Sequence, residues 1–334
     1  MSKFRLPSFL RIVVLGIAGV CSGASVENPV QFQGICDASA VVGLNENAVA
    51  VANDEDNVIR IYSRDGGVPL WEKDFSAFLR VDPKNPETDI EAATRTGNRV
   101  YWLTSHGRNA KGKVRQSRCR FFATTVVAGS GQVVLQPEGQ PYARLLDDLA
   151  KASKLARFNL AGAARLAPKS PGALNLEGLA ALPNGELLIG FRNPIPGGRA
   201  LAISLTNPAD LLEAKPPVFG EPVLLNLDGF GIRSLEWTDD RFLIVAGSFG
   251  DGGRSRLFEW SGEGSPPSEV GMVNLKGLNP EGITTLHDGG GPLGLLIISD
   301  DGNREIDGRP CKSLSDPSRK GFGGLFVTPL PKFF

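Results

Sequence analysis

A pattern of apolar and polar positions recurs five times along the chain. Each copy has a polar residue, a spacer and then Glu or Gln, followed by small apolar residues and a turn. An apolar strand ending in polar residues comes next, and then a third strand with an aromatic or aliphatic centre. The copies begin at Gln31, Asp89, Asn175, Ser234 and Asn279. Short strands with Gly, Asn and Asp turns that repeat every 45 to 60 residues, roughly, are typical of β-propeller blades.

A fourth strand can be read after most copies, at 69–73, 222–227 and 270–275. The last copy ends near the C-terminus after its third strand, whereas 29–32 precedes the first copy. We therefore predict that 29–32 supplies the missing fourth strand of the last blade and closes the ring.

The separation from Glu91 to Glu177 is 86 residues, too long for one plain blade. Within it, Leu145, Leu149, Ala152 and Ala156 have helical spacing. This spacing predicts a helical insertion around 143–165, within outer limits of about 138–172, or else an eroded sixth blade. The expected fold is an all-β propeller of five or six four-stranded blades.

The N-terminus reads as a secretory signal peptide. Three basic residues precede the apolar run 12–20, and small residues lead to a cleavage site after Ala24. Nine apolar residues fall short of the roughly 20 needed to span a bilayer, so no stable membrane span is expected. We predict a signal peptide at 1–24, a single propeller domain at 25–334, and a periplasmic or extracellular location.

Charge and composition narrow the function classes. The chain has 36 basic and 36 acidic residues, and removal of 1–24 leaves 33 against 36, so net charge does not favour binding to nucleic acid or an anionic membrane. Only two histidines argue against a His-rich zinc site. In an oxidising compartment, Cys36, Cys119 and Cys311 can form one disulfide with one thiol left, or stay as three buried thiols.

The repeat predicts a functional site. In an antiparallel hairpin the start of strand one lies beside the end of strand two, and first strands line the channel of a propeller. Acidic residues at these positions should therefore meet at one channel mouth. They are Asp54, Asp89, Glu91, Glu177, Glu236, Glu281, Asp300 and Asp301. Oxygen ligands favour calcium or magnesium over zinc, and we expect calcium. Alternatively, the repeated glutamates accept hydrogen bonds from backbone amides of the next blade and brace the ring.

Other polar residues are expected at the same mouth. Arg108, Lys169, Arg192, Asn193 and Arg233 are the candidates for holding an anion. His106 is the candidate general acid or base. The loop 108–120 has six basic residues and no acid, so it either attracts an anionic molecule or polymer or is simply solvated. Aromatic residues are not interleaved with these charges, so no nucleic acid is expected.

Several stretches together resemble the uncharacterised bacterial family of secreted propellers called domain of unknown function 3616. They are GICDASA, NDEDNVIRIY, DIEAA, YWLTSHGRNAKGK, LNLEGLAALPNGELLIGFRNP, GIRSLEW and SDDG with Cys311-Lys312. This resemblance implies a propeller and no particular activity. The patterns around Glu177 and Asp300-Asp301 more distantly resemble phytase-like and esterase-like propellers, which implies calcium-assisted hydrolysis of a phosphoester.

The leading expectation is thus an exported propeller that uses a divalent cation to hydrolyse anionic esters at one channel mouth. A non-enzymatic envelope propeller that binds protein or glycan is the alternative, and a lactonase-like propeller is a third. The sequence does not predict the oligomeric state.

Overall fold

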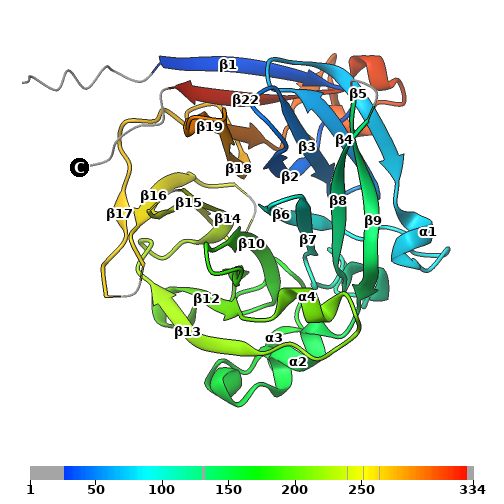
Figure 1. Cartoon of the computed structure of the whole chain (residues 1–334). Helices are drawn as coiled ribbons and strands as arrows, with labels where there is room; N and C mark the ends of the chain where they lie inside the picture. The colour runs from blue at the N-terminus through cyan, green and yellow to red at the C-terminus, as the bar shows by residue number, and fades with distance from the viewer. Residues whose placement is uncertain (1–25, 130–131, 239, 251, 263, 329–334) are drawn as a thin grey trace, which may run out of the picture.

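The chain folds into a ring of four-stranded antiparallel sheets (Figure 1). The computed structural model describes residues 26–129, 132–238, 240–250, 252–262 and 264–328. The predicted signal peptide lies outside the described residues. Within the described ranges the ring has five blades, so the expectation of a propeller is confirmed and the sixth blade is not found.

The first four blades each use four strands in chain order, from the channel outwards. Blade one comprises β2 (Ala38–Gly43), β3 (Ala48–Asn53), β4 (Val58–Ser63) and β5 (Gly66–Asp74), and blade two comprises β6 (Ile90–Thr96), β7 (Arg99–Thr104), β8 (Phe121–Gly129) and β9 (Gln132–Tyr142). Blade three comprises β10 (Asn175–Ala181), β11 (Leu187–Asn193), β12 (Ala200–Leu205) and β13 (Phe219–Leu225), and blade four comprises β14 (Gly231–Trp237), β15 (Phe242–Gly247), β16 (Arg256–Trp260) and β17 (Ser268–Glu269).

Blade five is assembled from both ends of the chain. Its strands are β18 (Pro280–His287), β19 (Pro292–Ser299), β22 (Gly321–Thr328) and, outermost, β1 (Val26–Gln33). β1 pairs antiparallel with β22 over its whole length, which confirms the predicted closure of the ring. β1 also meets β5 through one parallel pair, Phe32 with Gly67, so blades five and one join into an eight-stranded sheet.

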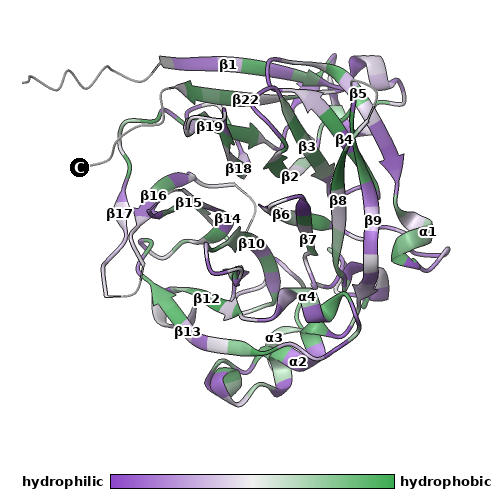
Figure 2. Cartoon of the chain, in the orientation of Figure 1, coloured by the Kyte–Doolittle hydropathy of each residue, from purple (hydrophilic) through white to green (hydrophobic). Residues whose placement is uncertain are grey.

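Apolar side chains on both faces of each blade hold the ring together. The five innermost strands contact one another in the order β2, β6, β10, β14, β18 and back to β2. All six residues of β3 and of β15 are buried, as expected for strands covered on both faces. Figure 2 shows hydrophobic residues along the inner and middle strands, and more hydrophilic residues on outer strands such as β5 and β9.

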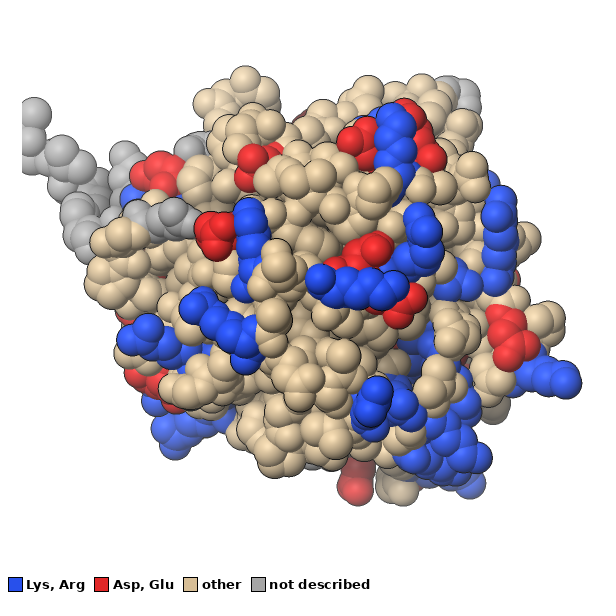
Figure 3. Space-filling model, turned by 90° about the horizontal axis from the view of Figure 1, so that it is seen from below, with Lys and Arg blue, Asp and Glu red and all other residues tan. Residues whose placement is uncertain are grey.

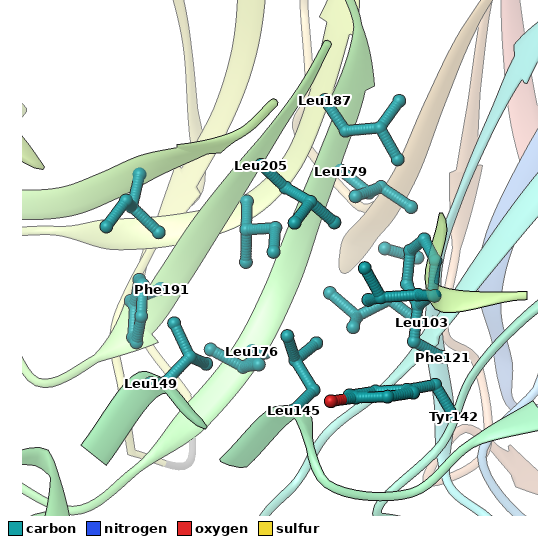
Figure 4. Close-up of a cluster of buried hydrophobic side chains, with 14 of the residues drawn as sticks. Leu103, Phe121, Tyr142, Leu145, Leu149, Leu176, Leu179, Leu187, Phe191 and Leu205 are labelled. Atoms are coloured by element: carbon teal, nitrogen blue, oxygen red, sulfur yellow. The ribbon is translucent and has the colours of Figure 1, made fainter. Parts of the chain in front are cut away.

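The predicted helical insertion follows β9 and connects blades two and three. It contains α2 (Leu145–Lys151), the 3-10 segment η2 (Ser153–Phe158) and α3 (Leu160–Ala163). Leu145 and Leu149 are fully buried against Phe121, Leu176 and other side chains of the two blades (Figure 4). The insertion is therefore part of the hydrophobic core.

The remaining elements are short. They are α1 (Ser76–Leu79), α4 (Pro208–Leu211), the 3-10 turns η1 (Gln116–Arg118), η3 (Pro196–Gly198), η4 (Cys311–Ser313) and η5 (Pro317–Arg319), and the ribbon of β20 (Glu305–Ile306) and β21 (Arg309–Pro310). In the described part of the chain, no helix is long and apolar enough to cross a membrane.

Two strand predictions are wrong. The outer strand of blade four is only β17, and 270–275 is not a strand. The first strand of blade one starts at Ala38 and not at Gln31, because Gln31 and Gln33 belong to β1. Only the start of the first copy is wrong, because 29–32 belongs to the closing strand of blade five, as predicted.

Cys36 and Cys311 form a disulfide across a sequence separation of 275 residues. One of the two predicted cysteine states is thereby confirmed, with Cys119 as the remaining thiol, half-buried. The disulfide joins the segment between β1 and β2 to the long connection between β19 and β22. It therefore fastens blade five to blade one at the place where the ring closes.

Replacing both Cys36 and Cys311 by Ser should lower the free energy of unfolding by about 2–5 kcal/mol, because the disulfide restricts the unfolded chain over a very long loop. Denaturant unfolding of residues 25–334 measures this effect. Cys119→Ser is the matched control and should change stability much less. Equal stability of the double variant and the wild type would contradict the prediction.

Candidate functional site

A polar pocket of about 770 Å³ occupies one mouth of the central channel. Its walls come from the starts of first strands, the ends of second strands and the loops beyond them. Among the described residues, eight acidic and six basic side chains line it: Asp37, Asp54, Asp89, Glu91, Glu177, Glu281, Asp300 and Asp301, with Arg118, Lys169, Arg192, Arg233, Arg304 and Lys312. Seven of the eight predicted acids therefore converge, and Glu236 does not.

A β-bulge at the same place in every first strand positions the innermost side chains. In each blade the pairing between strands one and two skips one residue near the mouth. The skipped residues are Ser39, Glu91, Glu177, Arg233 and Glu281. All five line the pocket, so equivalent positions carry three carboxylates, one guanidinium and one hydroxyl.

This register explains why the prediction that Glu236 lies at the mouth is wrong. The bulge residue of blade four is Arg233, and Glu236 lies three residues further along β14, about 10 Å away at the usual rise of a strand. Glu236 lines a second pocket at the other end of the channel. There it accepts a hydrogen bond of 2.6 Å from the backbone N–H of Thr285 in blade five. For Glu236 the alternative prediction, bracing of the next blade, is therefore correct.

Arginines and glutamates alternate along one wall of the pocket. Arg192 donates to Glu177 at 2.7 Å, and Arg233 contacts Glu281 through Nε at 2.9 Å and through Nη2. Arg233 Nε also lies 3.9 Å from Glu177, so it connects the two carboxylates. Arg192 further donates to the backbone oxygens of Ser248 and Gly250. Both arginines thus hold the wall of the pocket in place.

The opposite wall carries a cluster of three carboxylates. Carboxylate oxygens of Asp37, Asp54 and Glu55 lie within 4.8 Å of one another. Asp37 precedes β2 and the other two follow β3, so the hairpin of these strands brings them together. Asp54 Oδ1 is buried and has no hydrogen-bond partner among the described residues. Three carboxylates with an unpartnered oxygen form a suitable site for a hard divalent cation.

Burial and mutual repulsion raise the pKa values of Asp37 and Asp54 in this cluster. Burial, followed by the charges of Asp300 and Glu55, raises the pKa of Asp37 to about 7. Burial and then the charges of Asp89 and Asp300 raise the pKa of Asp54 well above its usual range. A bound cation would relieve this repulsion, because it favours the ionised forms.

Asp300 and Asp301 follow β19 beside this cluster. Asp300 and Asp37 form an isolated antiparallel bridge between their backbones. Asp301 accepts hydrogen bonds from Ser299 and from the N–H of Gly323, and it pairs with Arg304 at 3.0 Å. Asp300 therefore adjoins the cluster, whereas the carboxylate of Asp301 is engaged in holding the loop.

Gly302 makes room for the cluster. A Cβ at this position would lie 1.7 Å from Asp37 Oδ1, so any other residue would force the Asp37 carboxylate to move. The Asp-Asp-Gly sequence after β19 thus has a steric reason, since glycine lets the loop pass against the Asp37 carboxylate.

Asp89 and Glu91 complete the acidic side from blade two. Burial raises the pKa of Asp89 to about 6, although Arg118 donates to it at 2.7 Å. Burial and the charges of Glu177 and Asp89 raise the pKa of Glu91 well above its usual range.

Three of the other predicted residues do not line the pocket. His106 is buried with Nδ1 2.7 Å from the carbonyl oxygen of Thr104, and burial lowers its pKa to about 4. Arg108 donates to the carbonyl oxygens of Ala164 and Gly112, and Asn193 donates to those of Pro168 and Ser170. These residues secure loops beside the mouth. Lys169, by contrast, lines the pocket from the end of the insertion.

Sequence reasoning missed several lining residues, notably Asp37, Ser39, Arg118 and Lys312. The segment GICDASA contains both Asp37 and Ser39. The predicted first strand of blade one begins too early, at Gln31, so the sequence did not place these two residues at the start of the strand. Lys312 stood out in the sequence only as part of the family motif with Cys311, and it reaches the pocket through the disulfide-bonded connection, where it lies 3.8 Å from Glu55.

The fold and this mouth define a five-bladed propeller with a carboxylate-rich channel entrance. The family described as "Protein of unknown function (DUF3616)" matches residues 132–306, which is more than half of the chain. The chain belongs to this family, as its motifs predicted. A comparison with curated proteins finds no match.

Solved structures with a similar fold have low sequence identity to this chain. A putative oxidoreductase (glucose dehydrogenase) from Thermus thermophilus is 14% identical, with a TM-score of 0.42 and coverage of 91% of this chain and 100% of that one. A PQQ-bound aldose sugar dehydrogenase from Streptomyces coelicolor is 10% identical, with a TM-score of 0.45 and coverage of 91% and 98%. A GH43 protein from Bacillus licheniformis is 10% identical, with a TM-score of 0.46 and coverage of 92% and 57%. At this level the likeness carries no functional argument.

Removing the carboxylate of Glu281 should destabilise the protein strongly, because it leaves Arg233 buried without one of its two acidic partners. We expect Glu281→Ala to lower the free energy of unfolding by about 3–5 kcal/mol. Glu269→Ala is the matched control, since its pair with Arg256 at 3.4 Å is solvent-exposed and should contribute less than about 1 kcal/mol. Similar losses in the two variants, measured by denaturant unfolding, would show that the Arg233 pair is not the support described above.

Proposed function

We propose that the carboxylate-rich mouth binds a divalent cation, with calcium as the best match. We further propose that it hydrolyses anionic esters and that phosphoesters are the leading substrate class. The observation that carries the proposal is the convergence of Asp37, Asp54 and Glu55 with an unpartnered buried oxygen on Asp54. All available donors are oxygens, which suits calcium or magnesium. Asp300 adjoins the cluster and can add a further oxygen.

Different residues of the pocket would have different roles in such a site. A divalent cation held by Asp37, Asp54 and Glu55 would supply Lewis acidity toward the anionic group. Lys169, Arg304 and Lys312 line the same pocket and can attract that group. Arg192 and Arg233 act indirectly, because their N–H groups hold Glu177, Glu281 and the neighbouring loop.

Hydrolysis requires a group that takes a proton from water and returns one to the leaving oxygen. The water oxygen bonds to phosphorus, and the ester oxygen leaves as an alcohol. His106 is buried outside the pocket, so we assign the proton transfer to a carboxylate. Asp89, with a pKa of about 6, is the best candidate because it can be ionised at neutral pH and still accept a proton.

We also propose that the protein is exported, with a signal peptide at 1–24. The disulfide supports this, because disulfides persist in oxidising compartments.

A second candidate is a propeller that binds a partner through a cation without turnover. The positions of His106, Arg108 and Asn193 favour it, because these three residues bond to backbone carbonyl oxygens beside the mouth and do not line the pocket.

Thermal unfolding of residues 25–334 tests the cation site. Calcium at a hundredfold excess over its dissociation constant should stabilise the protein by about 2.7 kcal/mol, and a chelator should reverse the effect. Asp54→Asn should abolish the shift. Glu236→Gln, a change of a half-buried acid at the other end of the channel, should retain it. No calcium shift in the wild type, or an undiminished shift in Asp54→Asn, would refute the site.

The calcium effect should grow with pH between about 6 and 8. Because the pKa of Asp37 is raised to about 7, a proton competes with the cation below that pH. One competing proton changes the apparent affinity about tenfold per pH unit below the pKa, and the change levels off above it. Calcium titrations at several pH values measure this slope. A flat profile would exclude an ionised Asp37 as a ligand.

Turnover separates the two candidate functions. A hydrolase should release 4-nitrophenol from 4-nitrophenyl phosphate or its diester only when calcium is present, and Asp54→Asn should lose this activity. Calcium binding without turnover of either ester would instead support the binding propeller.

A further inference from the structure

Positive charge is concentrated in one sector of the ring. Residues 108–169 contain twelve Lys and Arg but only three Asp and Glu, whereas the rest of the chain contains 24 basic and 33 acidic residues. The segment covers the β7–β8 loop, the outer half of blade two and the helical insertion. Seen from below in Figure 3, Lys and Arg side chains gather towards the lower right, where acidic side chains are sparse.

Two parts of this sector pack together beside the pocket. Arg108 of the β7–β8 loop donates to the carbonyl oxygen of Ala164, and a Cβ at Gly112 would lie 3.8 Å from the side chain of Ala167. Ala110 of the loop lines the pocket, as does Lys169 at the end of the insertion. The loop and the end of the insertion therefore form a continuous rim that leads into the mouth.

The rim presents exposed basic side chains. Lys111, Lys113 and Arg165 are exposed, and within the described ranges none of them forms an ion pair with an acidic residue. We call these three residues the basic rim. Since no acidic side chain of the described residues neutralises these three charges, they are available to a ligand in solution.

We propose that the basic rim docks a linear, phosphate-bearing polyanion and guides one of its phosphate groups to the carboxylate-rich mouth. The inference rests on the proposed function, because it names the substrate class of that site. A polymer fits better than a single small anion, since the positive charge extends over the loop and the insertion and is not confined to the pocket. Such a surface raises the local concentration of an anionic chain and releases its counterions on binding.

The side chains around the rim favour a polymer without bases. Phe121, Phe122 and Tyr142 of this sector are buried, and Phe158 is half-buried with Arg157 over its ring. Nucleotide bases would need exposed aromatic faces to stack on. The charges alone suit a chain such as polyphosphate, in which every unit is anionic.

Binding of fluorescent long-chain polyphosphate to residues 25–334, measured by anisotropy over a range of salt concentrations, tests the proposal. The variant Lys111→Gln/Lys113→Gln/Arg165→Gln should bind at least tenfold more weakly at low salt. Its slope of log K against log salt should be shallower by about 2, as expected for three lost phosphate contacts on a single strand.

A matched variant removes the same charge elsewhere. Lys73, Arg199 and Arg309 are also exposed and do not adjoin in the chain the residues that line the pocket at the mouth, so Lys73→Gln/Arg199→Gln/Arg309→Gln should bind within about twofold of the wild type. The calcium-dependent melt should be unchanged in both variants, which separates failure of the rim from failure of the cation site. Equal losses in the two variants, no binding by the wild type, or tighter binding of single-stranded DNA than of polyphosphate would overturn the inference.

Discussion

The pairing of β1 with β22 is the interaction on which the rest of this structure depends. Five blades close into a ring only if the last blade receives its fourth strand from the start of the chain. The Cys36–Cys311 disulfide fastens the same junction. The disulfide also positions two residues of the pocket, because Asp37 directly follows Cys36 and Lys312 directly follows Cys311. The closure that stabilises the ring also brings together residues from opposite ends of the chain.

Around the channel, near-equivalent blades produce an asymmetric mouth. The bulge recurs in all five first strands, but it presents Ser39, Arg233 and three glutamates. Arg233 replaces repulsion by attraction on one side, where it contacts Glu281 and lies near Glu177. On the side of blade one, three carboxylates lie within 4.8 Å of one another, and Lys312 lies 3.8 Å from one of them, Glu55. The symmetry of the fold thus makes the pocket, and the departure from symmetry creates the acidic side at which we propose that a cation binds.

The two ends of the channel have different roles. At the far end, the carboxylate of Glu236 and the hydroxyls of Thr94 and Thr284 bond to backbone N–H groups of neighbouring blades. Their hydrogen-bonding capacity is used in bracing the ring. At the mouth, the buried Oδ1 of Asp54 has no such partner in the described part of the chain. Buried polar groups normally find partners, but Thr285 Oγ1 at the far end also lacks one among the described residues. The unpartnered oxygen therefore supports the proposed cation site only together with the convergence of Asp37, Asp54 and Glu55.

The blade pattern, the closing strand, the helical insertion and seven of the eight acids at the mouth could be predicted from the amino-acid sequence. These follow from short-range signals, namely strand periodicity, turn residues and the position of polar residues at strand ends. The register of the bulge, which places Arg233 and not Glu236 at the mouth, became clear only in the folded structure, as did the partners of His106, Arg108 and Asn193. The physical reason is that a bulge shifts a strand by one residue, and that hydrogen bonds between distant loops have no local pattern in the chain.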